Sequence, residues 1–141
     1  MKKRLVILLA SFILYQFTHA QGCLPQGIIF TSQAQIDNFQ SDYPGCTEIE
    51  GDVEINGIDI TNLDSLNVLT TINGYLTIEE NPRLQSVAGL GNLSGLGSTF
   101  TLFKNDSLQN LSGLENLTVI TDGLDISDND QLHNLNGLHN L

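Results

Sequence analysis

The sequence predicts a mainly β protein, a parallel β-solenoid of 24-residue coils that begins with a capping helix. Three observations lead to this fold class. From residue 76 onward the sequence repeats with a period of 24 residues. Each repeat contains a short alternation of apolar and polar residues, which is typical of a strand with one face buried. A helix-like segment between two cysteines precedes the first repeat.

The first twenty residues have the pattern of a secretory signal peptide. Lys2, Lys3 and Arg4 form a charged start, and residues 5–17 form a mostly apolar run. Small residues end this segment and predict cleavage after Ala20. The run is shorter than the roughly 20 apolar residues of a membrane-spanning helix, so an uncleaved anchor is the weaker alternative. We therefore expect a secreted or cell-surface protein with no transmembrane segment in the mature chain.

Secretion gives a meaning to the only two cysteines, Cys23 and Cys46. An oxidising compartment favours a disulfide between them. A lipoprotein interpretation of residues 20–23 is an alternative, but it would leave Cys46 without a partner. A catalytic cysteine would need a histidine nearby in space, and His133 and His139 lie far downstream in the sequence. The disulfide is therefore the favoured prediction.

Residues 21–50 are expected to form a disulfide-linked N-terminal cap with a short helix. Ser32 and Gln35 have the spacing of a capping box. Ile36 and Phe39 then follow at helical spacing, and the turn residues 43–45 predict the end of the helix. Such a helix would cover the apolar end of the first coil, which would otherwise remain an open edge.

The repeat region, residues 51–141, divides into coils 51–73, 74–97, 98–121 and 122–141, of which the last is incomplete. The unit is L-x-[IL]-x-x-N-x-x-L-x-x-[LV]-x-G-L-x-N-L. We expect each coil to contribute one short strand, and the coils to stack at about 4.8 Å. The recurrent Asn81, Asn105 and Asn129 predict an inward column of amides that pairs loop backbone groups. Because the sequence stops in mid-repeat, we expect the natural protein to be longer.

The segment Cys46-Thr-Glu-Ile-Glu-Gly-Asp-Val-Glu-Ile55 resembles the receptor L domain, the leucine-rich β-helix of the extracellular lobes of the insulin and epidermal growth factor receptors. Together with the signal peptide, the cysteine pair and the repeats, it is more similar to bacterial secreted proteins with repeats of this type. The resemblance covers residues 23–141. It implies a right-handed, leucine-rich-repeat solenoid and an extracellular binding or adhesion role, but it implies no particular ligand.

Charge and composition exclude several classes of partner. Without residues 1–20, two basic residues remain against 16 acidic ones, a formal net charge of −14. This balance argues against nucleic acid and against an anionic membrane surface. Glu48, Glu50, Asp52 and Glu54 alternate along what we expect to be one strand, so calcium is an open alternative. Solvated acids are the simpler explanation, and we expect neither a metal nor another cofactor.

The strand register predicts a candidate ligand face on the outward side of the sheet. Aromatic rings beside acids and hydroxyls suit a sugar or a cationic peptide, although threonines and aromatics are also simply good strand residues. The predicted face consists of Asp52, Glu54, Tyr75, Thr77, Glu79, Thr101, Phe103 and Asp125.

We predict a non-catalytic binding or adhesion module that recognises an extracellular protein or glycan. No catalytic residue is expected, because no histidine or basic cluster accompanies the acidic pairs. One alternative is a structural spacer that presents a missing C-terminal domain. A carbohydrate-active enzyme, which would use paired carboxylates such as Glu54 and Glu79, is the weaker alternative.

Overall fold

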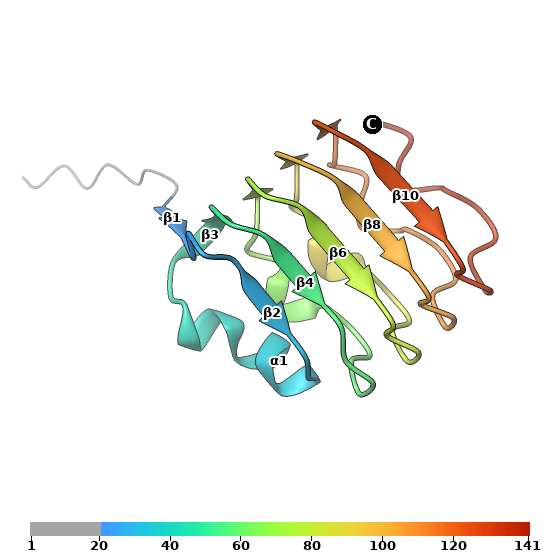
Figure 1. Ribbon diagram of the computed structural model, residues 1–141, viewed down its shortest axis with the longest axis horizontal. Helices are drawn as coiled ribbons and strands as arrows, with labels where there is room; N and C mark the ends of the chain where they lie inside the picture. Colours follow the sequence, from blue (N-terminus) through green and yellow to red (C-terminus); the bar gives the residue numbers. More distant parts are fainter. Residues whose placement is uncertain (1–20) are drawn as a thin grey trace, which may run out of the picture.

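The computed structural model describes residues 21–141, and the predicted signal peptide with its cleavage site after Ala20 lies outside the described residues. The chain is mainly β, with two parallel sheets and one α-helix (Figure 1). Within residues 21–141, no helix has both the length and the apolar character needed to cross a membrane.

The longer strands form one five-stranded sheet, which we call the long sheet. Its strands are β2 (Ile28–Phe30), β4 (Val53–Ile55), β6 (Leu76–Glu79), β8 (Phe100–Phe103) and β10 (Leu124–Ser127). They lie in the order β10-β8-β6-β4-β2, and each neighbouring pair is parallel. Leu76 pairs with Phe100 and Phe100 with Leu124, so the sequence period is also the step between paired residues.

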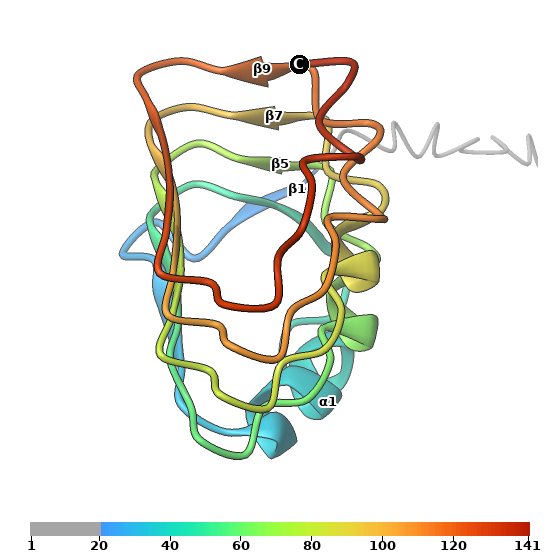
Figure 2. The same cartoon turned by 90° about the vertical axis from the view of Figure 1, so that its right-hand side faces the viewer.

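A second parallel sheet, the short sheet, consists of β1 (Gln21–Cys23), β3 (Cys46–Ile49), β5 (Thr71–Ile72), β7 (Gly95–Leu96) and β9 (Val119–Ile120). Their order is β1-β3-β5-β7-β9. Figure 2 shows that this sheet forms a different side of the stack from the long sheet. The expectation of one strand per repeat was therefore wrong. Three of these strands have only two residues, too few for an alternating pattern to be visible in the sequence.

The second sheet also corrects the expected row of acidic residues. Glu48 belongs to β3 in the short sheet, whereas Glu54 belongs to β4 in the long sheet. Glu50 and Asp52 lie in the corner between these strands. At this corner Gly51 packs directly against the backbone of Gly27, where no Cβ would fit. The four carboxylates therefore do not share one strand.

The apolar core lies between the two sheets and a third side formed by turns and two 3₁₀-helices, η1 (Asp64–Leu66) and η2 (Ala88–Leu90). The inward residues of successive strands stack on one another, and Leu76, Ile78 and Leu102 have no exposed surface. Burial of a leucine or isoleucine side chain contributes about 1.5–3 kcal/mol. Because each apolar position recurs in the next repeat, one continuous core runs through the stack.

Helix α1 (Gln33–Asp42) buries Ile36 and Phe39 completely, and the Phe39 ring meets Phe30 edge-on at 5.8 Å between centroids. The expected capping box does not form, because the Ser32 side chain makes no capping hydrogen bond. Gln35 Oε1 instead accepts hydrogen bonds from the Thr31 N–H (2.6 Å) and hydroxyl (3.2 Å).

Side chains of α1 hold it against the loop and the 3₁₀-helix that follow β4. Gln33 Oε1 accepts from the backbone N–H groups of Thr61 (2.7 Å) and Asn62 (3.2 Å). Gln40 Nε2 donates to the Ser65 carbonyl (2.9 Å). Beside the helix, the Cys23–Cys46 disulfide joins β1 to β3 with 5.7 Å between the Cα atoms. The disulfide thereby closes the segment that contains α1, and the side chains of α1 attach this segment to the first repeat.

Buried asparagines follow β6 and β8 at the same position in each repeat. Asn81 and Asn105 have no exposed surface. Asn81 Nδ2 donates to Asn105 Oδ1 (3.0 Å), and Asn105 Nδ2 donates to Asn129 Oδ1 (3.2 Å). The same Nδ2 atoms donate to carbonyls of the preceding strand, Ile55 (2.9 Å) and Ile78 (2.9 Å). We call Asn81, Asn105 and Asn129 the asparagine column.

The first repeat carries Gly57 where the later ones carry asparagine, and its N–H donates to Asn81 Oδ1 (2.8 Å). A Cβ at Gly57 would meet the carbonyl of Thr31 in the preceding segment. The column therefore starts from a backbone donor because no side chain fits at that position.

Replacement of Asn105 by alanine is expected to lower the free energy of unfolding by about 3 kcal/mol or more. The change removes the acceptor of the buried Asn81 N–H and breaks the side-chain hydrogen bonds to Asn81 and to the Ile78 carbonyl. An unpaired buried group costs about 1–3 kcal/mol, and each lost hydrogen bond about 0.5–1.5 kcal/mol. Urea denaturation measures the loss. Asn38→Ala on the exposed side of α1 is the matched control and should change stability little. Equal losses for both variants would show that the column does not stabilise the fold.

Reduction of the disulfide is expected to lower the free energy of unfolding by about 3 kcal/mol, because the bond closes a loop of 23 residues in the unfolded chain. Urea denaturation with and without a reductant measures this difference. The Cys23→Ser, Cys46→Ser double variant should match the reduced protein and should not respond to the reductant. A wild-type protein that is equally stable in both conditions would contradict the prediction.

Candidate functional site

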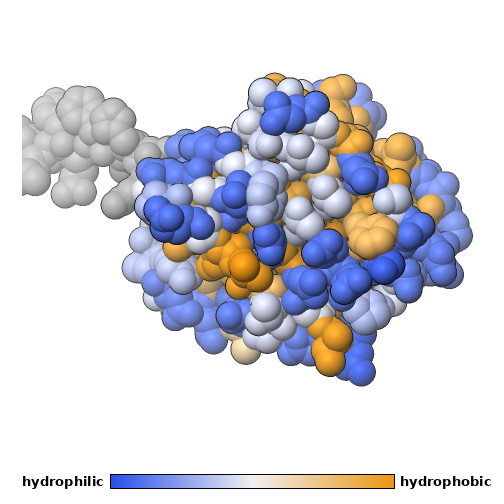
Figure 3. Space-filling model, in the orientation of Figure 1, coloured by the Kyte–Doolittle hydropathy of each residue, from blue (hydrophilic) through white to orange (hydrophobic). Residues whose placement is uncertain are grey.

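The outward side chains of the long sheet, together with Asp52 and Tyr75, form a surface that we call the outer face. Parallel pairing aligns Glu54 on β4 with Thr77 on β6 and Thr101 on β8. The same row continues to Ile29 on β2 and to Asp125 on β10. These five side chains are half-buried or exposed, and Figure 3 shows this side of the molecule as mostly hydrophilic with separate apolar patches. The face therefore presents a mixed surface to solvent.

A second row of the outer face consists of Glu79, Phe103 and Ser127. Lys104, which follows Phe103, holds its Nζ atom 4.7 Å from the centroid of the Phe103 ring and 3.4 Å from Glu80 Oε1. Glu80 and Lys104 both have φ values near +54°, in the left-handed region. This conformation ends β6 and β8 and turns the two charged side chains to the edge of the face.

Tyr75 forms hydrogen bonds with two acidic residues of the outer face, Asp52 and Glu54. Its N–H donates to Asp52 Oδ1 (3.0 Å), and its hydroxyl donates to Glu54 Oε1 (2.5 Å). The Asp52 carboxylate reaches the Tyr75 backbone because Gly74 has no side chain, since a Cβ there would collide with Asp52 Oδ1. Tyr75 thus fixes the positions of two carboxylates.

The hydrogen bond to Glu54 is the largest of the effects that raise the pKa of Tyr75 to about 12. Desolvation and the negative charges of Glu54, Asp52 and Glu79 act in the same direction. Each of these effects disfavours the tyrosinate anion. The hydroxyl therefore remains a hydrogen-bond donor to Glu54 at any physiological pH.

A shallow groove of about 440 Å³ crosses the outer face at β4, β6 and β8. Two carboxylates, one phenol ring and several hydroxyl groups line it, and none of its lining residues is basic. Such a surface offers hydrogen-bond acceptors and negative charge to a ligand. The lining residues are Glu54, Tyr75, Thr77, Glu79, Ser98, Thr99 and Thr101.

The groove brings together Glu54, Tyr75, Thr77, Glu79 and Thr101 from the predicted face. The other three predicted residues lie around it. Asp52 accepts a hydrogen bond from the Tyr75 N–H, Phe103 lies beside Glu79, and Asp125 lies on β10 next to Thr101.

Three residues in or near the groove were missing from the prediction, namely Ile29, Ser98 and Thr99. Ile29 is 55 % exposed and begins the row that contains Glu54. It was overlooked because β2 lies in the segment assigned to the cap, although the Ile28–Phe30 run was a possible strand signal. Ser98, whose Oγ donates to Asp122 Oδ2 (2.8 Å), precedes β8 and lies outside the alternating pattern.

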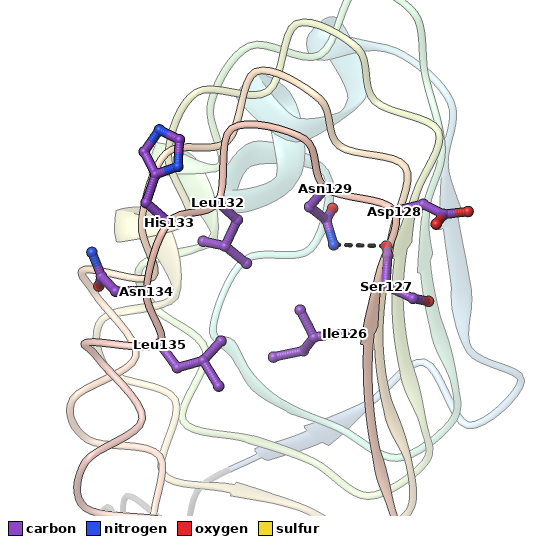
Figure 4. Close-up of a pocket in the computed structure, with 8 residues that line it drawn as sticks. All are labelled: Ile126, Ser127, Asp128, Asn129, Leu132, His133, Asn134 and Leu135. Carbon is purple, nitrogen blue, oxygen red and sulfur yellow. Dashed lines mark hydrogen bonds between the residues drawn. The ribbon is translucent and has the colours of Figure 1, made fainter.

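A second hollow, of about 330 Å³, lies at the last repeat (Figure 4). Ile126, Leu132 and Leu135 point into it, whereas the corresponding Leu102, Leu108 and Leu111 of the preceding repeat are completely buried. The hollow is thus lined by residues that form core in the other repeats. His133, which also lines the hollow, is exposed.

Acidic side chains also line the edge where β4, β6, β8 and β10 end, at Glu80, Asp106, Asp128 and Asp130. Lys104 lies among them and pairs with Glu80. Within residues 21–141, no three histidine, cysteine or acidic side chains come together as a metal ion would need.

Comparison with known proteins adds one match. Residues 45–108 match the family model described as the receptor L domain. The matched segment contains every residue that lines the groove, from Glu54 on β4 to Thr101 on β8. No curated protein matches the chain.

Replacement of Glu54 by alanine is expected to lower the pKa of Tyr75 from about 12 toward its ordinary value of 10.0, because it removes both the hydrogen bond to Glu54, which is the largest cause of the shift, and the charge of that carboxylate. Ultraviolet difference absorbance measures ionisation of the tyrosines, and Tyr75→Phe identifies the signal of Tyr75. The raised pKa also means that the stability from the Tyr75–Glu54 contact is present below pH 10 and is lost between about pH 10 and pH 12. A Tyr75 that titrates near pH 10 in the wild type would contradict the assignment.

Proposed function

The chain is receptor L-domain-like from residue 45 to residue 108, and we propose that it acts as a secreted or cell-surface, non-catalytic module that binds an extracellular protein or glycan. The proposed architecture is a right-handed solenoid with coils at 51–73, 74–97, 98–121 and 122–141. Residues 21–50 serve as its N-terminal cap. The 24-residue step between β6, β8 and β10 and the contacts of α1 with residues 61–65 support this architecture.

Ligand binding is assigned to the outer face, and the groove between β4 and β8 is the observation that carries this assignment. The groove is concave and lies inside the segment that matches a family of binding domains. Its side chains are preorganised, since Tyr75 holds both Asp52 and Glu54 in place. Preorganised side chains lose little conformational freedom when a ligand binds.

The roles of the acidic residues support binding rather than catalysis. Glu54 accepts a hydrogen bond from a phenol whose pKa is about 12, and that phenol does not release its proton at neutral pH. Asp52 is occupied by a backbone N–H. Both carboxylates therefore act as positioned hydrogen-bond acceptors. The Cys23–Cys46 disulfide supports an extracellular location, because such bonds persist in oxidising compartments.

The assignment is tested with a pair of threonine-to-tryptophan variants. Thr77→Trp fills the groove on the long sheet, and Thr71→Trp adds the same bulk to the outward side of the short sheet. The wild-type protein is screened on arrays of purified surface proteins and of glycans. For any ligand found, we expect Thr77→Trp to weaken binding by at least about tenfold and Thr71→Trp by less than about twofold.

Two results would contradict the assignment. Equal binding by both tryptophan variants and the wild type would exclude the outer face. A wild-type protein that binds nothing on the protein array and nothing on the glycan array would favour the structural-spacer alternative. Thermal unfolding of each variant is the control that separates a blocked groove from a damaged fold.

A further inference from the structure

Charge is distributed unevenly between the groove and its surroundings. Residues 21–141 contain 16 acidic side chains, and their two basic ones are Arg83 and Lys104. Within these residues the one ion pair is Lys104–Glu80, at the edge of the outer face. Glu54 and Glu79 therefore line the groove without a basic partner in the described part of the chain. Their negative charges remain available to a ligand.

The position of these two carboxylates suits a single cationic group. Glu54 pairs in register with Thr77, and Glu79 lies two residues further along β6. The two backbone positions are thus separated by one strand spacing of about 4.8 Å and by about 6.6 Å along the strand. With Glu54 held by Tyr75, the Glu79 side chain can reach toward the same ammonium or guanidinium group across such a distance, and the Tyr75 ring lines the same groove.

The outer face already holds one cation in the same manner. Lys104 Nζ lies over the Phe103 ring and beside a carboxylate of Glu80. An aromatic ring and a carboxylate together stabilise a cation, because the ring quadrupole and the negative charge both attract it. In the groove, Tyr75 and Glu54 offer the same pair of groups, and neither Arg83 nor Lys104 forms an ion pair with Glu54.

Resting on the proposed function, we propose that the ligand is a basic polypeptide segment, with an arginine or lysine side chain seated in the groove between Glu54 and Glu79 and beside Tyr75. The exposed Ile29 lies at the β2 end of the row that includes Glu54 and Thr77 and provides an apolar contact for a neighbouring side chain. Five strands at about 4.8 Å span about the length of six extended residues. The high negative charge of the chain also speeds encounter with a basic partner.

The test uses the full chain and a fluorescent peptide of about eight residues in which arginine and serine alternate. A second peptide carries citrulline at each arginine position, which keeps the shape and removes the charge. Fluorescence anisotropy at physiological salt measures both affinities. We expect the wild-type protein to bind the arginine peptide at least about tenfold more tightly than the citrulline peptide.

Two double variants separate the groove from the overall negative charge. Glu54→Gln with Glu79→Gln removes the two groove carboxylates, and glutamine can still accept the hydrogen bond of Tyr75. Asp37→Asn with Asp64→Asn removes two exposed carboxylates on α1 and η1. We expect the groove variant to weaken arginine-peptide binding by at least about fivefold and the control variant by less than about twofold. Circular dichroism and thermal unfolding confirm that both are folded.

Each of the other outcomes overturns the inference. They also distinguish failure of the inference from failure of the proposed binding function. Equal weakening by the two double variants would mean diffuse attraction to an acidic protein. Failure of the wild type to bind the arginine peptide would exclude a basic ligand. Binding of a neutral glycan that Thr77→Trp blocks, without binding of the arginine peptide, would support the outer face as a ligand site and exclude the basic polypeptide.

Discussion

The hydrogen bonds of the asparagine column are the constraint on which the rest of the structure depends. A chain that turns between two sheets and a side of 3₁₀-helices and loops leaves backbone groups in its interior that neither sheet can pair, and such groups are costly when unpaired. Asn105 Oδ1 accepts from the Asn81 N–H and from Asn81 Nδ2, and Asn129 Oδ1 does the same for Asn105. One amide at a fixed position thus satisfies groups of two repeats, but only if successive repeats keep the same length between strand and turn.

That constraint also places the outer face. Because the column and the paired strands share one 24-residue step between β6 and β8, an outward residue of β6 must lie beside its counterpart on β8. The rows Thr77–Thr101 and Glu79–Phe103 follow directly. Substitutions on the outward side change the surface without changing the register, since inward and outward residues alternate along each strand. The core and the candidate ligand surface can therefore vary independently.

Much of the fold could be predicted from the sequence, because its signals are local and recur. The mainly β class, one helix and the Cys23–Cys46 disulfide are of this kind, and the structure confirms them. The short sheet could not be predicted, since strands such as Thr71–Ile72 are too short to alternate. The capping box at Ser32 was wrong because Gln35 bonds to Thr31 instead.

For the candidate site, the predicted strand register placed the residues in rows. The side-chain hydrogen bonds between strands could not be predicted from the sequence. The hydroxyl of Tyr75 lies outside the alternating pattern of β6 and reaches Glu54 on β4, a contact that depends on a side-chain rotamer and on the room left by Gly74. Ser98 also lines the groove, and it lies in the turn before β8, where the alternation of the strand does not indicate which side a residue faces.

These contacts across strands give one part of a generally acidic surface a defined shape. A mobile carboxylate in water attracts a cation weakly, because ordering the side chain opposes the gain from the charge. At the outer face that cost is already reduced, since Tyr75 holds Glu54 through its hydroxyl and Asp52 through its backbone N–H. The pKa of about 12 keeps the phenol protonated, so the arrangement does not change over the physiological pH range. Overall charge can bring a basic partner to the protein, but only the positioned carboxylates can select where on the surface it is held.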